Sequence, residues 1–146
     1  MNYKLKKISK SQAGMSLLEI MVSLSILVVT FISLMQSFPL ALAINKTSEN
    51  ATKASYLAQE KLEELNSLGY GNIAVGEIEA KHRLSGTPTD YLYYFQRQTA
   101  VNYVDGNLQN SVSDTGLKKI SVTVYYTNAL SKTEKIYSTV TLMSQW

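Results

Sequence analysis

The strongest constraint on this chain is an apolar run of 22 residues, from Leu17 to Phe38, that contains a single charged side chain, Glu19. As an α-helix the run is about 33 Å long at about 1.5 Å per residue, enough to cross a hydrocarbon layer of about 30 Å. Its other polar side chains are hydroxyls and one glutamine, and they form no polar stripe of the kind that a surface helix carries. The sequence therefore predicts a transmembrane helix over Leu17 to Phe38.

The segment before this run is basic. Its lysines are Lys4, Lys6, Lys7 and Lys10, and no acid accompanies them. Lysines beside a spanning helix hold that end in the cytoplasm, so we expect the rest of the chain to lie across the membrane. Removing these four positive charges from the net charge of +3 leaves −1, so the pI near 9 gives no reason to expect a nucleic-acid partner.

Glu19 is the exceptional residue of the apolar run. A carboxylate in a membrane segment is costly and is a functional candidate by default. A cut after Gly14 would give Met15 a new ammonium group four residues before Glu19. The two charges would then pair within one chain, or Glu19 would meet the ammonium group of a neighbouring chain and so direct assembly.

The stretch Gly14-Met15-Ser16-Leu17-Leu18-Glu19, followed by an apolar helix, resembles the prepilin-peptidase site of type IV pilins and pseudopilins. The resemblance implies cleavage after Gly14 and N-methylation of Met15, with Glu19 as the family's acidic fifth residue and assembly charge contact. Phenylalanine is commoner than methionine at the first mature position, but Met15 keeps its apolar character. The stretch Tyr56 to Leu65 is similar to the corresponding segment of PilV-like minor pilins and small type II secretion pseudopilins.

The same resemblance implies a structural subunit of a type IV pilus, a type II secretion pseudopilus or a competence pseudopilus. The expected partners are the prepilin peptidase, other pilin or pseudopilin subunits and an inner-membrane assembly platform. The expected location is the inner (cytoplasmic) membrane as a single-pass protein with its head outside, and then the pilus or pseudopilus in the cell envelope. No cofactor is expected.

Beyond the apolar run, Pro39 has no amide hydrogen and is expected to kink the helix. Apolar residues then recur mostly at spacings of three and four until Gly69, a natural helix end. They are Ile44, Ala51, Ala54, Leu57, Ala58, Leu62, Leu65 and Leu68. This pattern predicts an amphipathic continuation of the helix over residues 41–69.

The remaining segment, Tyr70 to Trp146, has the alternation typical of β-strands. We expect a weak strand at 75–84, a long strand from Tyr91 through Tyr103, and a loop over 107–116. The clearest signal is a hairpin of 120–127 and 136–143, joined by 128–133, with one face in water. The predicted fold is α+β, with three or four antiparallel strands packed on the outer half of the long helix. Its parts are a cleaved leader (1–14), a transmembrane and assembly helix (15–40), the helix continuation (41–69) and a β-rich head (70–146).

The polar residues of the head predict no enzyme and no metal site. His82 is the only histidine and there is no cysteine, so no set of zinc ligands can form. Asp90, Asp105 and Asp114 lack the dense oxygen spacing that calcium prefers. No nucleophile elbow and no phosphate-binding glycine loop is present.

Two other interpretations remain open. One is a stand-alone single-pass membrane protein with an exported β domain, not cleaved at Gly14. The other is secretion with cleavage after Ala41-Leu42-Ala43, which would release a soluble protein beginning near Ile44. Both leave the combination of Gly14 and Glu19 without an explanation.

Overall fold

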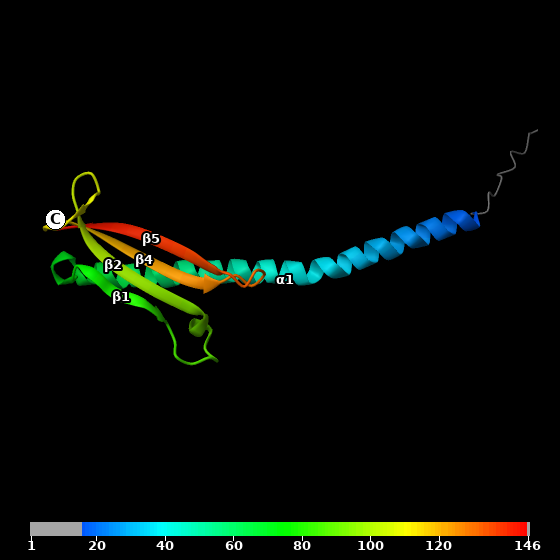
Figure 1. Ribbon diagram of the computed structural model, residues 1–146, viewed down its shortest axis with the longest axis horizontal. Coiled ribbons are helices and arrows are strands. Elements are labelled where there is room, and N and C mark those ends of the chain that lie inside the picture. The colour runs from blue at the N-terminus through cyan, green and yellow to red at the C-terminus, as the bar shows by residue number, and fades with distance from the viewer. Residues whose placement is uncertain (1–15, 146) are drawn as a thin grey trace, which may run out of the picture. The chain divides into compact units, whose positions relative to one another are not determined.

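The computed structural model describes residues 16–145, which form one long helix and an antiparallel sheet (Figure 1). The helix is α1 (Leu17–Leu68), and two short 3-10 turns are η1 (Tyr70–Asn72) and η2 (Tyr91–Tyr94). The strands are β1 (Gly76–Arg83), β2 (Phe95–Val104), β3 (Asn110–Ser111), β4 (Leu117–Thr127) and β5 (Glu134–Ser144). The predicted α+β class, with a long helix packed on an antiparallel sheet, is confirmed.

The chain divides into two compact units between Pro39 and Leu40. The first contains the apolar part of α1. The second contains the outer part of α1 together with the whole sheet. Pro39 lies inside α1, which continues to Leu68, and the kink expected there stays a prediction. At the far end, Gly69 takes a φ of 74° and a ψ of 162°, a backbone conformation that glycine adopts without steric cost and that ends the helix.

The sheet has the strand order β1-β2-β4-β5, and β3 pairs with β2 beside this path. It therefore has five strands, and the expected number of three or four is too low. The extra strand, β3, lies in the polar run that the sequence predicted as a loop. Its two residues pair through backbone groups opposite Tyr103 and Val104, and backbone pairing of two residues leaves no side-chain periodicity to detect.

The long strand predicted from Tyr91 is wrong in its first four residues. Tyr91–Tyr94 form η2, and β2 begins at Phe95. The cause is a local cap, in which the Asp90 carboxylate accepts a hydrogen bond from the Leu92 amide at 3.0 Å. Such a cap stabilises a turn over the extended conformation that the aromatic residues favour by propensity.

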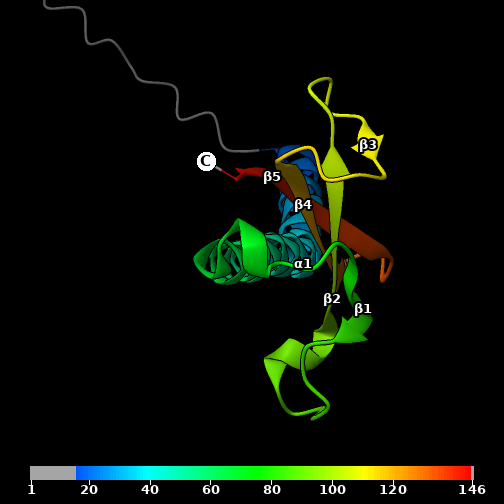
Figure 2. The ribbon, with the colours of Figure 1, turned by 90° about the vertical axis from the view of Figure 1, so that its left-hand side faces the viewer.

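The core of the second unit lies between α1 and one face of the sheet (Figure 2). Its buried side chains are Ala54, Ala58 and Leu65 of α1 with Ile73, Phe95, Val101, Ile120, Val122 and Val124. Ala54 and Ala58 are fully buried, and their small side chains allow the helix to approach the strands closely. The buried residues of β2 and β4 are apolar apart from Thr99 and Lys118.

The predicted hairpin is present as β4 and β5, paired from Leu117 with Ser144 to Thr127 with Glu134 and joined by residues 128–133. In β4, Ile120, Val122 and Val124 face the core, as the alternation predicts. In β5 the residues packed on the core are Tyr137 and Met143, whereas Ile136 and Val140 are 60% and 56% exposed. The apolar side chains of β5 therefore lie mainly on the outer face of an edge strand.

We predict that Ala58→Leu destabilises the fold by about 1–3 kcal/mol, because the extra methylene groups have no space between α1 and the sheet. Gln59→Leu is the control, since Gln59 is exposed on the same helix and the new side chain is the same. Thermal unfolding of the full chain in detergent, followed by circular dichroism, measures both. Equal melting temperatures for the two variants would contradict the close helix–sheet contact.

Candidate functional site

The apolar part of α1 is long and apolar enough to cross a membrane. An 18-residue window has a mean hydropathy of 2.4, and none of its residues is buried within the chain. The exposed side chains include Leu17, Met21, Val29 and Phe38, which point to different sides of the helix. A helix that is apolar all round needs lipid or other helices as its surroundings. Leu17 to Phe38 is thus a candidate single membrane span.

Four hydroxyl groups of this segment are satisfied by the helix itself. Ser25, Thr30, Ser33 and Ser37 each donate to the carbonyl oxygen four residues earlier, at 2.8, 2.5, 2.8 and 2.9 Å. A hydroxyl bonded in this way needs no water, so these residues lower the cost of placing the segment in lipid.

Glu19 lies exposed in the first turn of α1. Among residues 16–145, no cation lies within ion-pair distance of it, and the first cation after it in the chain is Lys46. Gly14, Met15 and the lysines of the leader lie outside the described residues. Any charge partner of Glu19 would therefore come from beyond the described part of this chain.

Ser16 gives Glu19 a possible local role that the sequence analysis missed. The Leu18 amide donates to the Ser16 hydroxyl oxygen at 3.3 Å, and the Ile20 amide donates to the Ser16 carbonyl at 3.2 Å. Ser16-Leu17-Leu18-Glu19 thus has the spacing of a capping box, in which serine caps the helix and glutamate occupies the third helical position. A negative charge there also interacts favourably with the positive end of the helix dipole. Any test of Glu19 has to separate this role from assembly.

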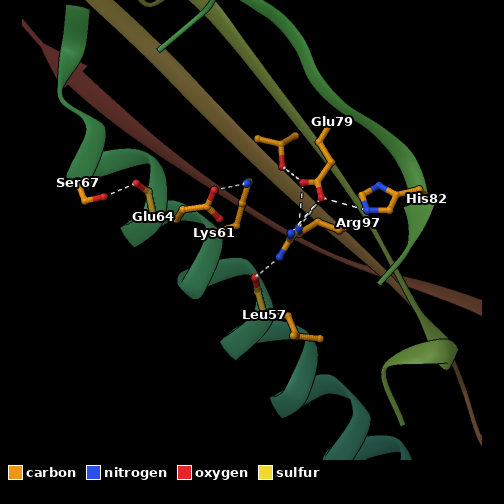
Figure 3. A network of polar contacts seen from close by, with 8 residues as sticks. Leu57, Lys61, Glu64, Ser67, Glu79, His82 and Arg97 are labelled. Carbon is orange, nitrogen blue, oxygen red and sulfur yellow. Dashed lines mark hydrogen bonds and ion pairs between the residues drawn. The ribbon is translucent and has the colours of Figure 1, made fainter. Parts of the chain in front are cut away.

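The most connected polar cluster in the head is centred on Glu79 of β1 and Arg97 of β2 (Figure 3). The Arg97 guanidinium donates to both Glu79 oxygens at 2.9–3.1 Å, and the Thr99 hydroxyl donates to Glu79 at 2.7 Å. Arg97 also donates to the Leu57 carbonyl of α1 at 3.5 Å. One ion pair therefore links two strands and the helix.

The charge state of Glu79 follows from these contacts. Burial raises the pKa of Glu79, but the hydrogen bonds from Arg97 and Thr99 outweigh it, so the pKa lies below its ordinary value. A carboxylate that is held ionised by a bidentate arginine is a poor proton donor or acceptor near neutral pH. The cluster is suited to holding the fold together.

His82 lies beside this cluster and is half exposed. Its Nε2 is 3.4 Å from a Glu79 oxygen, and its Nδ1 is 2.9 Å from the Ala80 carbonyl oxygen. Within residues 16–145, no group of three or more histidine, aspartate or glutamate residues is placed to hold a metal ion. Asp90 and Asp105 are engaged in capping local backbone amides.

Asp114 accepts hydrogen bonds from the Tyr70 hydroxyl and the Gly116 amide. Burial, together with the bond to Asp114, raises the pKa of Tyr70 to about 12. Next to this pair, the buried Lys118 ammonium donates to the carbonyl oxygens of Tyr70 and Ile73 at 2.7 and 2.8 Å. These contacts attach the turn after α1 to β4, and nothing in the sequence pattern singles out Lys118.

A groove that the sequence analysis also missed lies between α1, η2 and the loop that joins β4 to β5. Its volume is about 620 Å³, and its lining includes Lys46, Lys53, Lys132, Tyr91 and Tyr94. The Asn50 amide donates to the Thr127 carbonyl at 3.2 Å and ties the helix to the end of β4 there. These residues come from three separate segments, so their proximity is decided by the fold.

The chain was compared with protein families, curated proteins and solved structures. No protein-family model, no curated protein and no solved structure matches this chain.

We predict that Glu79→Gln lowers the free energy of unfolding at pH 7 by about 2 kcal/mol. This is the typical contribution of hydrogen bonds to a charged group, which the variant loses. The pKa of Glu79 is depressed in the folded state, so its stabilisation is complete above the unfolded pKa of about 4.3 and is lost as the pH falls through the folded value. The difference between wild type and variant should therefore shrink below about pH 4.

Chemical denaturation of the full chain between pH 3 and pH 7 measures this difference. Glu77→Gln is the matched control, because Glu77 is exposed and accepts one bond from a neutral donor, Gln98. A Glu79→Gln effect that is independent of pH, or no larger than that of Glu77→Gln, would contradict the assigned role.

Proposed function

We propose that this chain is a minor pilin or pseudopilin, a structural subunit of a type IV pilus or a type II secretion pseudopilus. The observation that carries the proposal is an apolar helix exposed on all sides, with Glu19 in its first turn. In the sequence, Gly14-Met15 lies just before this helix. In this proposal prepilin peptidase cuts after Gly14 and methylates Met15. The apolar helix first holds the subunit in the inner membrane and later packs among the helices of other subunits.

Processing changes the electrostatics of the helix end. The new ammonium group on Met15 adds a positive charge to a terminus that already carries the positive end of the helix dipole. Glu19 supplies the compensating charge, either to its own chain or to the ammonium group of the next subunit. In apolar surroundings an unpaired ion is costly. A neighbouring subunit is therefore bound most stably at the displacement along the helix axis that brings its ammonium group next to Glu19.

Four hydroxyls of the apolar segment need no new partner when the segment moves from lipid into a bundle of helices. The hydroxyls of Ser25, Thr30, Ser33 and Ser37 stay bonded to their own helix. The exposed apolar side chains exchange lipid contacts for contacts with neighbouring helices. The head, with its own core against the outer part of α1, folds without the apolar segment taking part in that core.

The competing interpretation is a single-pass membrane protein in which Ser16 and Glu19 only cap the helix. The bond from the Leu18 amide to Ser16 favours that role for the local sequence. The two interpretations differ in covalent structure, because only the first removes residues 1–14.

We predict that protein purified from membranes begins at Met15 and carries one added methyl group. Intact-mass measurement of protein from cells with and without the prepilin peptidase decides this, since the peptidase-deficient cells should yield the whole chain from Met1. Retention of the lysine-rich leader in both strains would refute the proposed function.

We predict that Glu19→Gln is cleaved normally but that its recovery in polymers falls at least about tenfold. The variant leaves an ammonium group unpaired in apolar surroundings, at a cost of about 3–5 kcal/mol. Glutamine is accepted at the third position of a capping box, so this variant keeps the cap and loses only the charge. Glu19→Asp is the matched control that keeps the charge.

The measurement is the share of mature subunit in sheared or detergent-resistant polymers. Glu19→Asp should recover part of the wild-type share. Wild-type assembly of Glu19→Gln would assign Glu19 to helix capping alone.

A further inference from the structure

The outer part of α1 carries a line of exposed or partly exposed residues, all of them charged except Tyr56. The line, here called the charged stripe, consists of Lys46, Glu49, Lys53, Tyr56, Glu60 and Glu63. Spacings of three and four residues place all of them on one helix face. Along this face the cations come first and the unpaired acids come last.

The internal ion pairs leave both ends of the charged stripe incomplete. Glu49 accepts from Lys46 at 3.0 Å and from Lys53 at 2.5 Å, so one carboxylate serves two ammonium groups. Within residues 16–145, no cation lies within ion-pair distance of Glu60 or Glu63. Each chain thus has an excess of positive charge at one end of the stripe and of negative charge at the other.

The basic end opens into the groove of about 620 Å³ described above. Lys132 adds a third ammonium group from the loop after β4, and within residues 16–145 it has no ion pair. The Lys53 ammonium lies 5.1 Å from the centre of the Tyr91 ring, and both Tyr91 and Tyr94 are more than half exposed. The groove thus offers cations and aromatic surface together, the combination that binds a carboxylate on an amphipathic segment.

We propose that this groove binds the acidic end of the charged stripe, Glu60 and Glu63, from a second copy of the same chain. The copies would lie parallel and be displaced along the helix axis. Glu60 is seven residues beyond Lys53 and fourteen beyond Lys46, so a displacement of about 10–20 Å brings the acids level with the cations. This inference rests on the proposed function, because assembly is what holds the copies side by side.

Charge balance favours a second copy over another acidic partner. From Leu40 onward the chain has ten lysine or arginine residues and ten aspartate or glutamate residues, so the second unit as a whole is neutral. A nucleic acid drawn to the groove would be repelled by the acidic end of the same stripe, whereas a displaced copy satisfies both ends. The contact joins the groove of one copy to the acidic end of the other.

The contact is expected to be weak by itself. Exposed ion pairs contribute about 0–1 kcal/mol each and are screened by salt. Heads that are already held close together by their membrane helices need no more than this, because the effective concentration of the partner is high. The charged stripe would then set the displacement between neighbours.

Carbodiimide coupling tests the contact, since it joins a lysine amine to a glutamate carboxyl group with loss of water only when the two groups touch. The sample is the full chain purified from membranes, half of it labelled with ¹⁵N and half unlabelled, reconstituted together in phosphatidylethanolamine–phosphatidylglycerol vesicles. We expect mixed-isotope peptides that join Lys46, Lys53 or Lys132 to Glu60 or Glu63. Lys61 and Glu64, 2.7 Å apart in one chain, supply a same-isotope product that confirms the reaction.

Charge-reversal variants give a second test of the same contact. Lys53→Glu should reduce the mixed-isotope products about fivefold, because one exposed ion pair becomes a repulsion. Lys53→Glu combined with Glu60→Lys should restore them. Lys135→Glu is the matched control, because Lys135 is exposed at the start of β5 and outside the groove.

Absence of mixed-isotope products at these positions while Lys61 and Glu64 are joined would overturn the inference, as would failure of the double reversal to restore them. The intact mass of the same sample separates this failure from that of the proposed function. A chain cut at Gly14 without the cross-links refutes the docking alone. An uncut chain with the cross-links refutes the pilin assignment and leaves the docking in place.

Discussion

Among residues 16–145, nothing covers the apolar part of α1, and the rest of the structure is arranged under that constraint. An 18-residue window of the helix is wholly exposed, and four hydroxyls of the apolar segment are bonded back to the helix. Such a segment is stable only in lipid or among similar helices. A chain that contains it must therefore have a head that folds without using that surface. In the proposed assembly it must also exchange lipid for protein partners.

The head meets the first requirement by using the other half of the same helix as one layer of its core. Ala54, Ala58 and Leu65 face the sheet, and the opposite side of this part of the helix is charged. A sheet formed by fewer than eighty residues buries too little apolar surface alone, so the helix is needed for its stability. The Glu79–Arg97 pair, with its bond to the Leu57 carbonyl, adds a polar link between the same two layers.

The charged groups of the head fall into two kinds with different consequences. Glu79, Arg97 and Lys118 are satisfied within the chain and serve the fold. Glu19, Glu60, Glu63 and Lys132 have no ion pair among residues 16–145. These four charges lie on the helix and beside its groove, which are the surfaces that the proposed assembly would bring against other subunits. In this view Glu19 selects the neighbour at the membrane, and the charged stripe selects its displacement outside it.

The sequence alone determined the helix, the hairpin of β4 and β5 and the α+β class, because each rests on a periodic pattern that side-chain chemistry imposes locally. It also placed Glu19 as the single charge of the apolar run, since that needs only the order of residues. Tertiary structure decided what depends on distant segments meeting. It paired β3 through backbone groups, buried Lys118 against two carbonyl oxygens and brought Lys132 beside Lys46 and Lys53. Backbone pairing and contacts between separate segments leave no period in the sequence, so they appear only when the sheet has packed on the helix.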